Sequence, residues 1–165
     1  PTRRSSDLLA DFLHMLGNPV AVIDSTGSTS MTRSLNLSYP LGILDVQRTL
    51  AVCAEDGVAA VIIAMNNATL QREALESVNV DVLGSERVAQ GEDVASLKTR
   101  YAFVSDRALA LTVPTGESDE LAAESPAMFD QDRLGHMSLA VAMVLAAGVR
   151  RNNVRSALRV ANNLR

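Results

Sequence analysis

The sequence of 165 residues has no tryptophan, one cysteine, two tyrosines and three phenylalanines. Because 47% of the residues are hydrophobic and few are aromatic, the core has to be built from aliphatic side chains. A single cysteine excludes internal disulfides and cysteine-cluster metal sites. Cys53 lies within a helical pattern, so we expect it to be a small core residue.

Long apolar runs and a net positive charge are also missing. No run approaches the roughly 18 apolar residues that a membrane-spanning helix needs, and the net charge of −4 argues against a general nucleic-acid surface. We therefore expect neither a membrane nor a nucleic acid as a partner. The C-terminus is locally basic, which we interpret as a solvated helix face; its arginines are Arg150, Arg151, Arg155, Arg159 and Arg165.

The most informative stretch is residues 58–65, which are all apolar and rich in β-branched side chains. Bounded by Gly57 and by Asn66, this run predicts a strand buried on both faces. Helical patterns precede it at residues 43–56 and follow it at residues 69–77. Helix, buried strand and helix in this order predict the centre of a parallel α/β sheet. Ligands bind such sheets at the carboxyl ends of the strands, so we expect any site near residues 64–69.

The remaining pattern completes one α/β domain. Residues 24–30 form a hydroxyl-rich loop without P-loop spacing, for which a plain turn is the favoured interpretation over a phosphate site. Residues 101–104 and 108–113 predict a hairpin, and residues 114–130 an acidic surface loop. Further predictions are helices at 8–16, 134–147 and 152–161, strands at 20–23 and 78–83, an irregular segment at 31–40 and partial helix within 84–98.

The first eight residues, Pro1-Thr-Arg-Arg-Ser-Ser-Asp-Leu8, do not fit this pattern. They resemble a translated adapter scar, so we expect residues 1–8 to be non-native and residues 9–165 to form the domain. The alternative is an ordinary disordered start.

Three motifs follow one another in the chain: Ile23-Asp-Ser-Thr-Gly27, Asn36-Leu-Ser-Tyr-Pro40 and Ile43-Leu-Asp-Val-Gln-Arg-Thr-Leu50. Together with residues 62–70 and 137–149 they resemble the central domain of the Mur ligase family, closest to the enzymes that add the third residue to UDP-N-acetylmuramoyl-dipeptide. Ile23-Asp-Ser-Thr-Gly27 is similar to the family's Ile-Gly-Thr-x-Gly turn, and Asn36-Leu-Ser-Tyr-Pro40 to its Asn-Thr-Thr-Pro segment. The helix beginning Ile43-Leu-Asp-Val-Gln-Arg-Thr-Leu50 resembles Leu-x-Leu-x-Arg-x-Leu. Residues 62–70 align with the strand ending Val-Met-Glu-Val-Ser-Ser-His-Ala-Leu, and residues 137–149 with a late alanine-rich helix.

This resemblance implies a three-layer, mostly parallel sheet flanked by helices, like that of P-loop NTPases. It also implies a cytoplasmic enzyme of peptidoglycan synthesis that uses ATP and Mg²⁺ to join an amino acid to a UDP-muramoyl peptide. The family's P-loop would precede Leu8, so we expect the domain to be truncated at its N-terminus. An exposed sheet edge left by such a loss would invite association.

The departures from the family concern its chemistry. The family's strand-end glutamate, which helps to hold Mg²⁺, aligns with Ala64, and its Ser-Ser-His with Asn66-Asn67-Ala68. Neutral amides and a methyl group supply no anionic metal ligand. We therefore predict no catalytic residue and no metal ligand in this chain, and the identity of a nucleotide-binding residue stays open.

Three hypotheses follow. The chain is a fragment of an ATP-dependent amide-forming ligase, or a catalytically degenerate relative that acts as a binding or structural module, or an unrelated α/β domain with a similar apolar pattern. For the first two, the resemblance implies that Ser25, Thr26, Asn36 and Ser38 contact the uracil, ribose or muramoyl group of a substrate. Turn-capping hydrogen bonds are the alternative role for these four residues.

Overall fold

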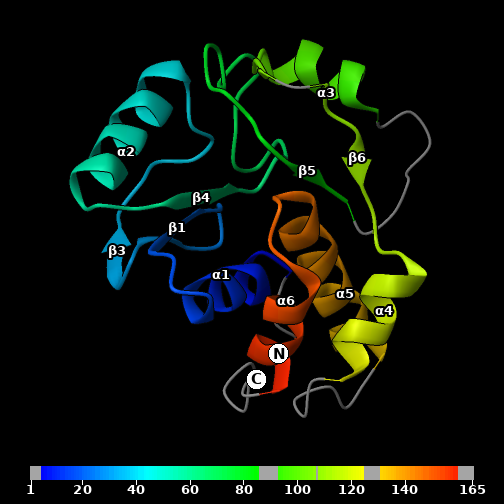
Figure 1. Ribbon diagram of the computed structural model, residues 1–165. Helices are drawn as coiled ribbons and strands as arrows, with labels where there is room; N and C mark the ends of the chain where they lie inside the picture. The colour runs from blue at the N-terminus through cyan, green and yellow to red at the C-terminus, as the bar shows by residue number, and fades with distance from the viewer. Residues whose placement is uncertain (1–4, 86–92, 107, 125–130, 160–165) are drawn as a thin grey trace. The chain divides into compact units, whose positions relative to one another are not determined.

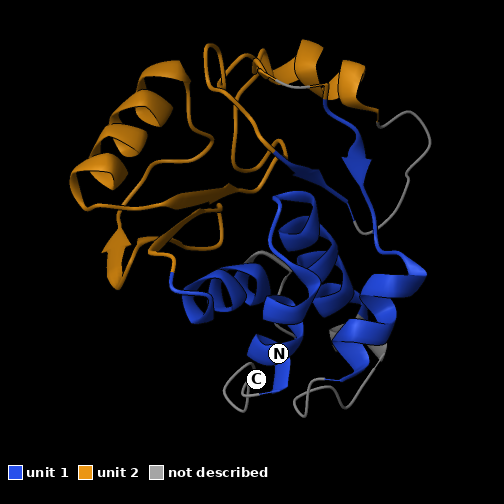
Figure 2. Cartoon of the chain, viewed as in Figure 1, with its two compact units in different colours: residues 1–17, 82–90, 109–165 blue, residues 18–81, 91–108 orange. Residues whose placement is uncertain are grey.

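A computed structural model of the chain describes residues 5–85, 93–106, 108–124 and 131–159 (Figure 1). The chain forms two compact units, each made of segments that are separate in sequence (Figure 2). Unit 1 comprises Pro1–Gly17, Val82–Gln90 and Leu109–Arg165, and unit 2 comprises Asn18–Asp81 and Gly91–Ala108.

Unit 2 is built on a four-stranded mixed sheet with the order β3-β2-β1-β4. β1 (Val20–Ile23) pairs in parallel with β4 (Ala60–Ile63) and antiparallel with β2 (Ser28–Ser30), which in turn pairs antiparallel with β3 (Arg33–Leu35). All four residues of β1 are buried, as expected for an apolar strand with a neighbour on each side.

Two helices and several turns complete unit 2. α2 (Ile43–Glu55) buries Val46, Thr49 and Cys53 at helical spacing and ends before Gly57, whose φ of 80° favours glycine. α3 (Val94–Tyr101) has Asp93 as its N-cap residue, whose side chain accepts a hydrogen bond from the N–H of Ser96. Beyond α3 the chain returns to the rest of unit 2 through a parallel bridge between Asn79 and Val104.

Unit 1 is mainly helical. Its helices are α1 (Ser5–Met15), α4 (Gly116–Ala123), α5 (Gln131–Ala146) and α6 (Arg151–Arg159). Two short strands, β5 (Leu83–Gly84) and β6 (Leu111–Thr112), pair with each other in parallel. α1 and α4 both pack on α5. The fully buried side chains of this unit include Leu8, Phe12, Leu121, Met137 and Leu158. None of the helices that the structure describes has both the length and the apolar character needed to cross a bilayer.

The strongest local patterns are confirmed. The helices predicted at 8–16, 43–56, 134–147 and 152–161 correspond to α1, α2, α5 and the described part of α6, and the strand at 20–23 is β1. The partial helix within 84–98 corresponds to α3, although residues 86–92 lie outside the described residues. Cys53 is buried as expected, and burial raises the pKa of its thiol.

The prediction for residues 58–65 is wrong in one important respect. The strand forms at β4, but it lies at the end of the sheet and none of its four residues is fully buried. β1 is the strand that takes the interior position. The protein is therefore mixed α/β with a small mixed sheet, and the broad parallel sheet expected from the apolar run is not observed among the described residues.

Several further predictions are corrected. Residues 72–77 form turns instead of a helix, and most of 78–83 is not a strand. Segments 101–104 and 108–113 do not form a hairpin, since Val104 pairs with Asn79 and β6 pairs with β5. The segment 28–35, expected to be loop and irregular chain, contains the β2–β3 hairpin. Part of the predicted loop 114–130 is α4, where Thr115 and Ser118 form a reciprocal capping box, and residues 125–130 lie outside the described part of the chain.

Candidate binding site at the carboxyl ends of two parallel strands

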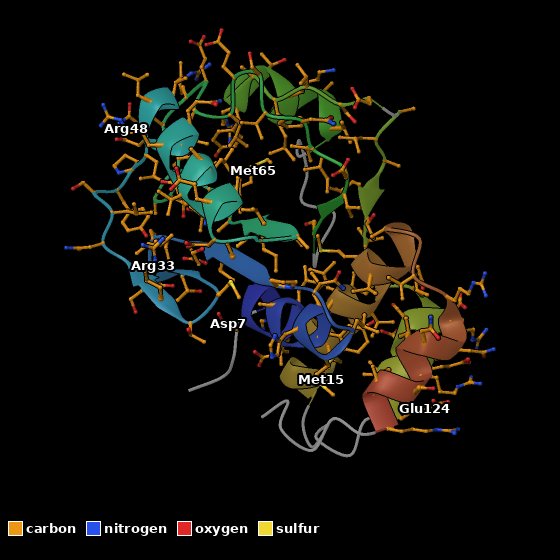
Figure 3. All side chains as sticks on the ribbon, turned by 60° about the vertical axis from the view of Figure 1, so that its left-hand side comes forward. Asp7, Met15, Arg33, Arg48, Met65 and Glu124 are labelled. Carbon is orange, nitrogen blue, oxygen red and sulfur yellow. The ribbon has the colours of Figure 1, made fainter. Side chains whose placement is uncertain are left out.

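The candidate site lies entirely within unit 2, where β1 and β4 end together. Ile23 is the register partner of Ile63, so the loops that follow the two strands leave the same edge of the sheet. The N–H of Ala64 continues the ladder by donating to the carbonyl oxygen of Ile23 over 2.9 Å. Met65 belongs to the loop after β4 (Figure 3). This is the edge at which open α/β sheets bind ligands.

The loop after β1 is closed by the side chain of Asp24. Its Oδ1 accepts hydrogen bonds from the N–H of Thr26 (3.0 Å) and from the Thr26 hydroxyl (2.9 Å), and the N–H of Gly27 donates to the Asp24 carbonyl oxygen (3.0 Å). Aspartate commonly forms such a turn with the backbone two residues ahead. Asp24 is only 7% exposed, and its carboxylate stabilises the loop from inside, whereas Thr26 lies at the surface.

Thr69 links this loop to the loop after β4. Its hydroxyl oxygen accepts a hydrogen bond from the N–H of Ser25 over 3.1 Å, and its own N–H donates to Oδ1 of Asn66 over 2.9 Å. The side chain is fully buried. A buried polar group is stable only when it is hydrogen-bonded, so this threonine fixes the spacing of the two loops.

The β2–β3 hairpin brings a third segment to the same edge. Ser28 is the register partner of Leu35, so residues 36–40 begin beside the loop that follows β1. The hydroxyl groups of Ser28 and Tyr39 are hydrogen-bonded to each other, which anchors that segment. Its continuation is held by the N–H of Leu41, which donates to the Thr69 carbonyl oxygen over 2.8 Å.

The four residues predicted to contact substrate are therefore brought to one edge of the sheet. Ser25 is half-buried and uses its N–H to bond Thr69, while Thr26 is exposed but hydrogen-bonded to Asp24. Asn36 and Ser38 are both exposed on the third segment. Turn stabilisation thus accounts for part of the role of the first two residues, whereas the second two have side chains at the surface.

The other contributors to this edge are not evident from local sequence. Tyr101, 1% exposed at the end of α3, donates from its hydroxyl to Oδ1 of Asn67 over 3.1 Å. Thr69 and Tyr101 each act on a partner more than thirty residues away, so no short motif marks them. The Asp24-x-Thr26 turn is the one feature that a local pattern could have identified.

Five exposed polar side chains on the three segments at this edge are uncharged: Thr26, Asn36, Ser38, Asn66 and Asn67. Amide and hydroxyl groups both donate and accept hydrogen bonds, so the edge suits a ligand rich in hydroxyl, carbonyl and amide groups. These residues do not fit the Mg²⁺ site that the resemblance implies, because Mg²⁺ is usually held through carboxylates and none of these five side chains, nor that of Ala64 at the end of β4, carries one. Within the described residues no group of three or more His, Cys, Asp or Glu side chains is placed to hold a metal ion.

Comparison with protein-family models, with curated proteins and with solved structures finds no match to this chain.

Proposed function

We propose that this chain is a Mur-ligase-like binding module that takes the uridine or muramoyl part of a UDP-muramoyl peptide at the carboxyl ends of β1 and β4. The observation that carries the proposal is the hydrogen bond from the N–H of Ser25 to the Thr69 hydroxyl, which holds the two strand-end loops at a fixed spacing. Exposed Asn36 and Ser38 lie beside these loops, on a segment anchored through Tyr39.

The chemistry of the edge supports a neutral, hydrogen-bonding ligand part. Uracil, ribose and an acetamido sugar offer carbonyl, N–H and hydroxyl groups, which asparagine and serine side chains can pair in both directions. Because such pairing leaves no buried group unsatisfied, it discriminates strongly against ligands that lack the matching groups. In this proposal the module acts in the cytoplasm, where the family's UDP-linked substrates are used.

Amide formation by an ATP-dependent ligase is the second candidate function. The order of α1, β1, α2, β4 and α5 follows the framework that the resemblance implies, which favours this candidate. The residues at the strand end oppose it, since phosphoryl transfer needs a metal ion to neutralise the developing charge. The side chain of Ala64 offers no oxygen for that ion, and Asn66 and Asn67 supply no anionic ligand.

Isothermal titration calorimetry tests the proposal. We expect UDP-N-acetylmuramoyl-dipeptide to bind the chain, and the double substitution Asn36→Ala with Ser38→Ala to weaken binding at least several-fold, about 1 kcal/mol or more for the lost hydrogen bonds. Asn153→Ala, at an exposed position on α6 in unit 1, is the control and should leave affinity unchanged. Unchanged affinity in the double variant would refute the site.

Titration with Mg-ATP separates the two candidate functions. The binding module should give no heat with Mg-ATP under conditions in which the UDP-linked ligand binds. Binding of Mg-ATP by the chain would favour the ligase, and an amide-forming assay with candidate amino acids would then decide between them.

A further inference from the structure

The two edges of the four-stranded sheet in unit 2 differ in chemistry. β3, at one edge, is three residues long and exposes Arg33 and Ser34. β4, at the other edge, belongs to the run 58–65, which has no charged residue, no proline and no glycine. Short length and charge are the usual means by which proteins protect a sheet edge from pairing with another chain. Both edge strands are short, but only β3 carries a charged residue, Arg33; β4 and the run around it carry none.

The backbone of β4 presents hydrogen-bonding groups along its outer edge. Ala60 and Ala64 donate their N–H groups to carbonyl oxygens of Pro19 and Ile23 on the β1 side. Since alternate residues of a strand turn their backbone groups to opposite edges, Val61 and Ile63 turn theirs away from β1. No strand of the described chain pairs with that edge.

The side chains of this run are incompletely covered. All eight residues from 58 to 65 are apolar, yet none is fully buried, and Val61 is 36% exposed. A β-branched strand of this composition is typical of a position with a neighbour on each side. A further apolar strand at the outer edge would accept and donate hydrogen bonds to the outward-facing backbone groups, and it would cover more of the apolar side chains.

We propose that the outer edge of β4 pairs with β4 of a second copy of this chain, in antiparallel orientation about a two-fold axis at Ile62. In this register Val61 of each copy lies opposite Ile63 of the other, and these are the residues whose backbone groups face outward. Each such pair exchanges two N–H to carbonyl hydrogen bonds. The proposal is independent of the proposed ligand site.

The sequence is self-complementary in this register. Ala60 falls opposite Ala64, and Ala59 opposite Met65. From residue 59 to residue 65, every cross-strand pair therefore joins two apolar residues, and no like charges meet. Pairs of β-branched residues are favourable across antiparallel strands. A two-fold axis also makes the contact closed, because the same patch is used by both copies. An interface made of one strand pair is small, so we expect a reversible dimer in the micromolar range.

Sedimentation equilibrium of the full chain over the micromolar range tests the proposal. We expect a concentration-dependent dimer in the unmodified protein and at least ten-fold weaker association in Val61→Lys, because two lysines would then flank the two-fold axis. The matched control is Ser34→Lys, which places the same charge on β3 at the other edge and should associate like the unmodified protein. A chain that stays monomeric throughout, or a Val61→Lys variant that dimerises normally, would overturn the proposal.

Amide hydrogen exchange gives a second readout that needs no substitution. The N–H groups of Val61 and Ile63 should be protected at high protein concentration and exchange faster on dilution. Protection that does not change with concentration would mean that the edge is covered within one chain, and fast exchange at every concentration would mean that it is bare. Either result contradicts pairing with a second copy.

Discussion

The two units of this protein hold their parts together by different means. In unit 1 the helices α1 and α4 pack on α5, with large side chains such as Leu8, Phe12 and Leu121 fully buried. The buried hydroxyl groups of Ser118 and Ser138 hydrogen-bond to each other over 2.7 Å. In unit 2 the sheet is small, and hydrogen bonds between residues distant in sequence connect its loops, as from Ser25 to Thr69 and from Tyr101 to Asn67.

This difference predicts what each unit is sensitive to. A packed helical core loses most stability when a large side chain is removed, because a cavity remains. A loop held by a buried hydrogen bond loses most when one partner is removed and the other is left unsatisfied. Tyr39 and Tyr101 both lie in unit 2, and the protein has no tryptophan, so tyrosine fluorescence reports on unit 2 alone.

The largest expected effect is in unit 1. Phe12 is fully buried on α1, and Phe12→Ala should lower the free energy of unfolding by about 3–5 kcal/mol. Urea unfolding followed by far-UV circular dichroism measures this loss. Leu44→Ala is the control, since Leu44 is 70% exposed and its loss should cost less than about 0.5 kcal/mol. Equal losses in the two variants would contradict the packing described for unit 1.

A smaller effect is expected in unit 2 from Thr69→Val. Valine keeps the shape of the buried side chain but removes the hydroxyl that accepts from the N–H of Ser25, so the free energy of unfolding should fall by about 1–3 kcal/mol. Tyrosine fluorescence during urea unfolding measures the change. Thr69→Ser retains the hydroxyl, and its Ser25 amide should remain protected from exchange. If the amide exchanges equally in both variants, the hydrogen bond does not link the loops.

The same difference explains what could be predicted from the sequence. α5 and α2 were predictable because a helix depends on local periodicity, and the burial of Val46, Thr49 and Cys53 follows that spacing. The environment of β4 was not, since its run is equally apolar whether a strand lies on one side of it or on both. The neighbours of a strand are set by distant residues, and those are what periodicity cannot show.

The candidate site follows the same rule. The apolar run predicts a site at the end of β4, and the resemblance implies one at the loop that follows β1; the structure places these two loops at the same edge of the sheet. Thr69 was missed because its partner is Ser25, which lies on another element. The start of α4 differs from Thr69, since Thr115 and Ser118 have the local spacing of a capping box, although the acidic composition around them favours a loop.

The smallest expected effect is a dependence on pH in unit 2. Oδ2 of Asp56 accepts hydrogen bonds from the Ser30 hydroxyl and from the Arg33 guanidinium, both at 2.6 Å; Arg33 is labelled in Figure 3. These two bonds, with that of Ser30 the larger cause, lower the pKa of Asp56 below its ordinary value of 3.8. They join the C-terminal end of α2 to the β2–β3 hairpin.

Because the pKa of Asp56 is lower in the folded chain than in the unfolded one, its stabilising contribution is fully present above about pH 4 and disappears as pH falls through the lowered value. The urea midpoints of the unmodified protein and of Asp56→Asn should therefore differ at neutral pH and converge in acid.

Two further variants sharpen this prediction. Ser30→Ala removes the larger cause of the lowered pKa, so it should raise the pKa of Asp56 and move the loss of stability in acid toward higher pH. Glu124→Gln breaks an exposed ion pair with Arg155 in unit 1 and should change the neutral-pH midpoint little, as surface pairs contribute little. A constant difference between the unmodified protein and Asp56→Asn at all pH values would show that the carboxylate charge has no part in holding the hairpin to α2.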